Sequence, residues 1–171
     1  YMLPSLDSLL KISNTQSIFD IPLEDNRQRL LSFPIGKYGN SVIALEQITE
    51  ILRVNLDEIL GVPEIPSSVL GAYNWRGEML WLIDLEHMIG SASLYEQVPL
   101  SKQPIAIVIQ LDNYCFGIVV KSVNEVELHD TTQIIPAKPG SFSTQLLPFI
   151  TGYLPNGSTV FNPKAVVQFY V

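Results

Sequence analysis

The feature that most restricts the fold is a succession of short apolar runs from Leu30 onward, each bounded by residues that form turns. Three pairs of runs predict β-hairpins: residues 31–45 around a Gly-Lys-Tyr-Gly-Asn loop, residues 105–120 around Asp-Asn, and residues 149–161 around Asn-Gly. Glycine, asparagine and aspartate tolerate the positive φ angles that tight reversals need. This spacing is typical of an all-β barrel or sandwich.

Helical signals are present but short. Residues 55–61 have Asn55 and Glu58 at the spacing of a capping box, which predicts about two helical turns. Asp84 is predicted to cap another short helix, and Pro163 stands at the first position of a third. None of these segments is long enough to build a helical bundle.

The strand expected at residues 79–85 does not alternate cleanly between apolar and polar residues, so we expect it to be buried on both faces. Two clusters of strands, residues 31–85 and 104–161, therefore predict two small barrels packed together, at roughly residues 30–90 and 100–165, with terminal strands able to cross between them. Residues 1–29 are predicted to be an arm or linker, in which residues 4–13 form a short amphipathic turn.

Composition excludes several classes of function. Seventeen acidic and ten basic residues give a net charge of −7, which disfavours binding to nucleic acid phosphates. The apolar runs are far shorter than the roughly 20 residues that span a bilayer, and no leader pattern opens the sequence, so we expect a soluble, cytoplasmic protein that does not insert into membranes. The single cysteine, Cys115, has no partner for an intramolecular disulfide and is expected to be a buried structural thiol.

Signatures of catalysis are missing from the sequence. It has no glycine-rich phosphate loop, no serine nucleophile elbow, and too few histidines and cysteines for a zinc site, so we predict no catalytic residue, no cofactor and no metal. His87 is expected near the C-terminus of a short helix, and His129 is expected to make a local hydrogen bond rather than to act as a general base. For Asp84 we favour the helix cap over a chemical role.

The segment LGAYNWRGEMLWLIDL, residues 70–85, places Tyr73, Trp75 and Arg76 between two glycines. These residue types often dominate the binding energy of protein interfaces. In the alternative interpretation the aromatic side chains are buried and Arg76 fixes the loop by bonding to nearby carbonyl groups. Both interpretations remain open on composition alone.

The same segment, extended to residues 70–90, resembles the signature of the CheW-like domains of bacterial chemotaxis. The matching residues are Gly71, Asn74, Arg76, Gly77, Asp84, Leu85 and Gly90. Further similarity lies in SVIALEQITEIL, in YCFGIVVKSVNEVEL and in FITGYL, so the resemblance covers most of residues 30–168. Two positions depart from the pattern, since Trp81 replaces a usual proline and Lys121 a common aspartate.

The resemblance implies a mainly β fold of two intimately packed SH3-like five-stranded β-barrels with a few short helices, which extends through residues 30–171. It implies a non-catalytic adaptor that links the cytoplasmic tips of chemoreceptors to the regulatory domain of a CheA-type histidine kinase. Arg76 and Glu50 are predicted to share one polar network. The predicted protein-binding residues are Ile48, Glu50, Gly71, Tyr73, Asn74, Trp75, Arg76 and Gly77.

Two other functions remain as alternatives. One is a CheW-like binding module of a pilus-driven motility system or another regulatory system, or a fragment of a larger kinase or response-regulator fusion. The other is a small-ligand-binding or hydrolytic β-barrel, whose mark would be a deep pocket with convergent polar groups.

Overall fold

The computed structural model describes residues 27–97 and 99–170. Eleven strands and two short α-helices lie in this part of the chain, together with several 3₁₀ turns. In chain order they are β1 (Arg27–Pro34), β2 (Asn40–Ala44), β3 (Ile48–Arg53), β4 (Val69–Trp75), β5 (Glu78–Asp84), α2 (Leu85–Met88), β6 (Ile105–Leu111), β7 (Tyr114–Val120), β8 (Val126–Asp130), β9 (Ile135–Pro136), β10 (Ile150–Tyr153), β11 (Thr159–Phe161) and α3 (Pro163–Tyr170).

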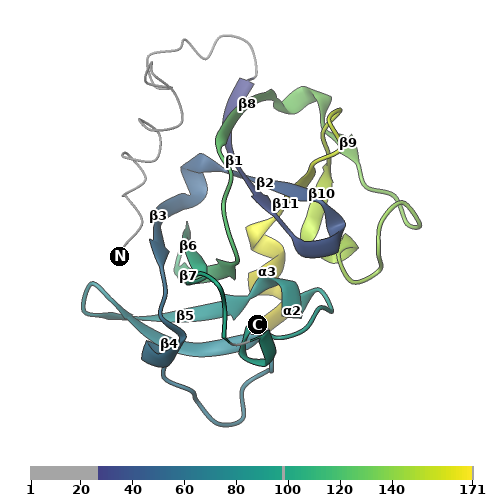
Figure 1. Ribbon diagram of the computed structural model, residues 1–171. Coiled ribbons are helices and arrows are strands. Elements are labelled where there is room, and N and C mark those ends of the chain that lie inside the picture. Colours follow the sequence, from purple (N-terminus) through teal and green to yellow (C-terminus); the bar gives the residue numbers. More distant parts are fainter. Residues whose placement is uncertain (1–26, 98, 171) are drawn as a thin grey trace.

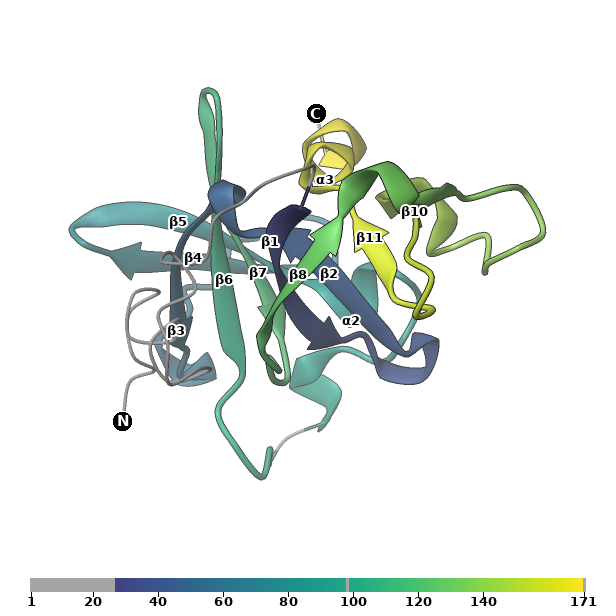
Figure 2. The same cartoon turned by 90° about the horizontal axis from the view of Figure 1, so that it is seen from above.

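The strands form two sheets. One has six strands in the order β8-β1-β2-β11-β10-β9, and the other has five in the order β3-β6-β7-β5-β4. Neighbouring strands are antiparallel except for the pairs β11–β2 and β5–β7. Each sheet is strongly curved, and α3 lies between the two in both views (Figures 1 and 2). The predicted mainly β architecture of two packed barrels is confirmed, with six strands rather than five in one of them.

All three predicted hairpins are present, as the antiparallel pairs β1–β2, β6–β7 and β10–β11. Two of the turns contain the residues from which they were predicted, and these residues have the positive φ angles that a tight reversal needs. The φ angle is 45° at Asp112 and 92° at Gly157. A left-handed backbone is accessible to aspartate and free of steric strain for glycine.

The two sheets are not divided at the expected place in the sequence. Strands β1 and β2 pair with β8 and β11, whereas β3, β4 and β5 share a sheet with β6 and β7. The exchange therefore involves whole hairpins and not only terminal strands, and a boundary between residues 90 and 100 does not separate the sheets. The chain changes sheet at a 3₁₀ turn, Leu45–Gln47, which delivers β3 to its antiparallel partner β6.

The predicted arm is shorter than expected by three residues at its C-terminal end. Arg27, Gln28 and Arg29 already belong to β1 and pair with Asp130, His129 and Leu128 of β8. The rest of the predicted arm, including the amphipathic turn at residues 4–13, lies outside the described residues.

Two of the predicted helices are confirmed and one is wrong. The Asp84 side chain accepts a hydrogen bond from the first turn of α2, and Pro163 opens α3. Residues 55–61 contain a single 3₁₀ turn instead of two α-helical turns, because Leu60 forms a bridge to Ala72 and draws the chain into an extended conformation. Tertiary pairing here overrides a local capping signal.

Strand β5 contributes to two separate cores. Leu82 packs inside the five-stranded barrel, while Ile83 faces the large core between the sheets. Complete burial of such side chains stabilises the fold by about 1.5–3 kcal/mol each. The prediction of a strand buried on both faces is thus correct for its C-terminal half and wrong for its N-terminal half, where Met79 is 66% and Trp81 38% exposed.

A protein-docking candidate at the β4–β5 turn

The β4–β5 hairpin closes with the two-residue turn Arg76-Gly77, flanked by the pair Trp75 and Glu78. The φ angles of Arg76 and Gly77 are 53° and 79°. Positive φ at both central residues is the requirement of a type I′ turn, whose twist matches that of the strands. The Gly77 amide also donates to Asn74 Oδ1 at 3.1 Å. A left-handed backbone costs a residue with a Cβ about 1–2 kcal/mol, so Arg76 occupies a position better suited to asparagine or glycine.

Glu50 on β3 holds this turn in place. Trp75 Nε1 donates to Glu50 Oε2 at 2.5 Å, and Arg76 Nη2 lies 3.3 Å from the same oxygen. The Arg76 guanidinium stands 4.9 Å from the centre of the Trp75 ring, at cation–π distance. Strands β3 and β4 are the two edges of the five-stranded sheet, so these contacts join its edges. The predicted network of Arg76 with Glu50 is present, and Trp75 is its third member.

The network exposes its cation and shields its anion. The Arg76 side chain is 62% exposed, whereas the Glu50 side chain is 19% exposed. Asn74 is exposed, and both Trp75 and Tyr73 are half-buried against the barrel core. The surface around the turn therefore offers a guanidinium and aromatic edges, held on a hairpin whose backbone is fixed by hydrogen bonds.

Two of the predicted binding residues are buried. Ile48 is 6% exposed and packs in the core between the sheets. Gly71 is buried with a φ of 143°, and a Cβ there would lie 2.2 Å from the carbonyl oxygen of Leu60. These positions shape the strands that carry the turn rather than offering side chains to a partner.

Sequence reasoning missed two exposed apolar residues beside the turn. Met79 and Leu60 are 66% and 65% exposed and line a hollow of about 310 Å³, together with Tyr73 and Glu58. Burial raises the pKa of Tyr73, and the nearby Glu58 charge raises it further. Alternation along β5, with Leu80 inward and Met79 outward, would have predicted the exposure of Met79.

Asp84 and His87 have structural partners. The Asp84 carboxylate accepts hydrogen bonds from the His87 amide at 3.3 Å and the Leu94 amide at 2.8 Å, and it is 1% exposed. Burial raises the pKa of Asp84 despite those bonds. The His87 ring contacts the Ser91 carbonyl oxygen at 2.8 Å through Nδ1 and Ser67 Oγ at 3.1 Å through Nε2. Asp84 is a helix cap, as predicted.

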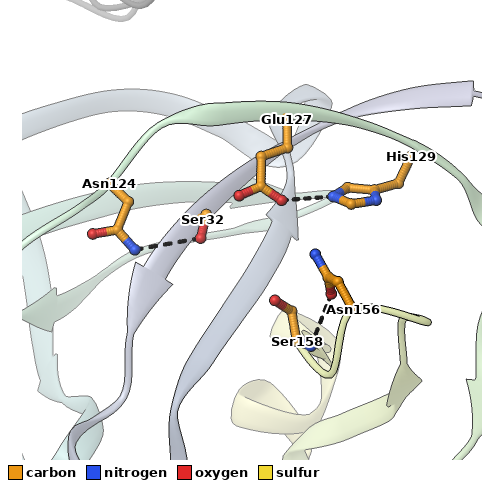
Figure 3. Close-up of polar contacts among 6 residues, drawn as sticks. All are labelled: Ser32, Asn124, Glu127, His129, Asn156 and Ser158. Carbon is orange, nitrogen blue, oxygen red and sulfur yellow. Dashed lines mark hydrogen bonds and ion pairs between the residues drawn. The ribbon is translucent and has the colours of Figure 1, made fainter.

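His129 lies on β8, where its Nε2 is 2.6 Å from Glu127 Oε1, two residues earlier in the chain (Figure 3). This is the local hydrogen bond that the sequence predicted. Nearby, the Asn156 side chain accepts from the Ser158 amide at 3.0 Å within the β10–β11 turn.

The remaining candidates for chemistry are a thiol and acidic clusters. Cys115 is half-buried, and its pKa is raised by burial and then by the Glu78 charge, which keeps the thiol in its less reactive protonated form. Within residues 27–97 and 99–170, no group of three or more His, Cys, Asp or Glu side chains is arranged to hold a metal ion.

Together, two packed β-barrels and a fixed Arg–Trp–Glu turn define a small β-rich scaffold with a preformed contact surface. The family model described as CheW-like domain matches residues 29–166, and the chain belongs to that family. This membership indicates, at the level of the family, a non-catalytic scaffold or adaptor of chemotaxis signal transduction.

A solved structure supports the fold. The chain is similar to the scaffolding protein TtCheW from Thermoanaerobacter tengcongensis, with a TM-score of 0.63 and 22% sequence identity over 79% of this chain and 87% of that chain. A comparison with curated proteins found no match. Among the described residues, no helix is both long and apolar enough to cross a membrane.

Proposed function

We propose that this protein is a cytoplasmic, non-catalytic adaptor that couples chemoreceptor tips to the regulatory domain of a CheA-type histidine kinase. The observation that carries the proposal is the fixed network of Arg76, Trp75 and Glu50 at the exposed end of a hairpin, in a chain of the CheW-like family. The predicted binding surface consists of this network with Tyr73, Asn74 and Gly77, supported from below by Ile48 and Gly71.

The geometry suits a docking role because the charged group is positioned before a partner arrives. Glu50 and the Trp75 ring restrict the Arg76 side chain, so less conformational entropy is lost when a partner binds it. Glu50 is largely shielded, so the guanidinium donors that do not face it are available to an acceptor on the partner. Arginine and tryptophan are also the residue types most enriched at binding hot spots.

The apolar neighbours extend this surface. Met79 and Leu60 lie beside the turn and expose apolar area next to the Arg76 charge. An apolar centre with a charged rim is the usual anatomy of a protein interface. An adaptor in a clustered receptor array can use several such modest contacts, because tethered modules raise one another's effective concentration.

The proposal is tested by binding the purified full chain separately to a receptor tip and to the regulatory domain of a CheA-type kinase. Arg76→Ala should weaken binding to at least one of them. Lys37→Ala is the matched control, because Lys37 is an exposed cation on the β1–β2 loop of the other sheet. Binding of the wild type to neither partner would contradict the proposal and favour a module of another regulatory system.

A further inference from the structure

A second surface, distinct from the Arg76 turn, is an apolar groove of about 410 Å³. One wall is the outward face of β5 and β7, with Trp81, Tyr114 and Phe116, and the other is α3, with Val166 and Val167. The loop before β4 closes one side through residues such as Ile65 and Pro66. We call this surface the α3 groove.

The α3 groove is a continuation of the core between the sheets that nothing covers in the described part of the chain. Trp81 pairs with Phe116 across the parallel strands β5 and β7, which places the two rings next to each other on one face. Phe116 belongs to the inter-sheet core, but Trp81 is 38% and Tyr114 46% exposed. Exposed aromatic area of this kind, contiguous with a core, marks a binding surface.

A hydrogen bond fixes the α3 wall of the groove to the loop that closes one side. Ser68 Oγ and the Tyr170 hydroxyl are hydrogen-bonded, which ties the end of α3 to the loop before β4. None of the groove's lining residues in the described chain is charged. The occupant must therefore present apolar side chains and keep its charges outside.

We propose that residues 3–12 of the same chain, LPSLDSLLKI, occupy the α3 groove. Leu3, Leu6, Leu9 and Leu10 follow the three-to-four-residue spacing that places apolar side chains on one face of a helical turn. The two charged residues of the segment, Asp7 and Lys11, fall between or beyond these leucines and cancel in net charge. The segment is thus apolar on one side and neutral overall, as the groove requires.

The tether between segment and domain is long enough. Residues 13–26 connect the segment to Arg27, where β1 begins, and 14 extended residues reach about 50 Å. A domain of this size is only about 40 Å across, with a radius of gyration of about 15 Å. A segment on such a tether has an effective concentration on the order of 1 mM, so it outcompetes free partners of similar affinity at micromolar concentration.

This inference goes beyond the adaptor function and does not depend on it. It assigns the N-terminal arm a role as an intramolecular cover of the α3 groove.

The test uses the full chain with Trp75→Phe, which leaves Trp81 as the sole fluorescent indole, since the sequence contains two tryptophans. Leu6→Glu/Leu9→Glu places charge on the apolar face of the segment. The matched control, Ser5→Glu/Ser8→Glu, adds the same charge to the segment at two positions that do not belong to its apolar face. Trp81 exposure is followed by emission maximum and by acrylamide quenching.

If the segment binds the α3 groove with a dissociation constant on the order of 0.1 mM, an effective concentration of about 1 mM keeps the groove occupied in about nine of ten molecules. A variant whose segment no longer binds should therefore raise the fraction of molecules with an unoccupied groove about tenfold. Leu6→Glu/Leu9→Glu should therefore shift Trp81 emission to the red and increase its quenching, while Ser5→Glu/Ser8→Glu changes neither. Nuclear Overhauser contacts between leucine methyl groups of residues 3–12 and the Trp81 ring should be present in the unsubstituted chain.

Three results would overturn the inference. Equal quenching in the leucine variant and the unsubstituted chain would show that the segment does not cover Trp81. Equal changes in the leucine and serine variants would show a charge effect instead of docking. Protection of Trp81 that disappears on dilution would identify a second copy as the occupant.

Discussion

The left-handed conformation of Arg76 allows its two roles, in the fold and in binding, to be measured separately. Arg76→Ala removes the guanidinium but keeps a Cβ in the strained backbone, where φ is 53°. Arg76→Gly removes the guanidinium and relieves the strain. The two variants thus lose the same binding group and differ in their effect on the turn.

The magnitudes follow from the contacts. The ion pair with Glu50 is largely exposed on the arginine side and contributes about 0.2–1 kcal/mol, and the contact with the Trp75 ring contributes about 0.5–1 kcal/mol. Arg76→Ala should therefore destabilise the protein by about 1–2 kcal/mol. Arg76→Gly loses the same contacts, but glycine has no steric strain in the left-handed conformation, which stabilises this variant by about 1–2 kcal/mol relative to Arg76→Ala. The free energy of unfolding of Arg76→Gly should therefore be close to that of the wild type.

Binding should respond differently from stability. Removal of a hot-spot arginine costs 2 kcal/mol or more, so both variants should bind the kinase regulatory domain or receptor tip about 30-fold more weakly. Urea unfolding gives the free energy of unfolding of each variant. A change of about 1 kcal/mol in that free energy corresponds to a shift of about 2–4 °C in melting temperature for a chain of this length. Isothermal titration calorimetry gives the affinity. A loss of more than about 3 kcal/mol of stability in Arg76→Gly, with unchanged affinity in the folded fraction, would refute the reasoning and give Arg76 a purely structural role.

Three further predictions concern stability. Burial raises the pKa of Glu86, so its charge opposes folding above the unfolded-state pKa of about 4.5. Glu86→Gln should therefore stabilise the protein at pH 7, and this gain in the free energy of unfolding should disappear as the pH falls toward 4. Urea unfolding at both pH values measures the gain, and an equal gain at pH 4 and pH 7 would contradict the prediction. Gly71→Ala should cost several kcal/mol because its Cβ would overlap a backbone carbonyl, while Gly77→Ala, with nothing within 4 Å, should cost only about 1 kcal/mol of strain; equal losses would contradict this difference. Asp84→Ala should cost about 2–4 kcal/mol, since it leaves two backbone amides without their carboxylate acceptor, and a melting temperature unchanged by calorimetry would show that the cap is dispensable.

Local turn chemistry explains what the sequence could predict of the fold. The Asp112 and Gly157 turns need backbone angles that only a few residue types tolerate, so they identify hairpins without knowledge of the rest of the chain. The assignment of strands to sheets could not be predicted in this way, because β1–β8 and β3–β6 pair residues far apart in sequence. The failed helix at residues 55–61 has the same origin, since its last turn is lost to the bridge between Leu60 and Ala72.

The candidate site was predictable only in part. Tyr73, Trp75 and Arg76 stand out by residue type, but no local rule places Glu50, twenty-five residues before Trp75, beneath the turn. That contact was expected only from the resemblance to CheW-like domains. Met79 was missed because its strand was interpreted as buried on both faces, whereas the N-terminal half of β5 buries one face, with Leu80, and exposes the other, with Met79 and Trp81.

The most direct test of the proposed docking surface is a map of amide and indole NMR signals during titration with the regulatory domain of a CheA-type kinase and with a receptor tip. At least one titration should perturb the signals of Glu50, the Trp75 indole, Arg76 and Gly77, with smaller changes elsewhere. Two results would contradict the account. One is a set of perturbations confined to the six-stranded sheet. The other is no perturbation by either partner at concentrations near 0.1 mM, where a specific but weak interface would still be visible.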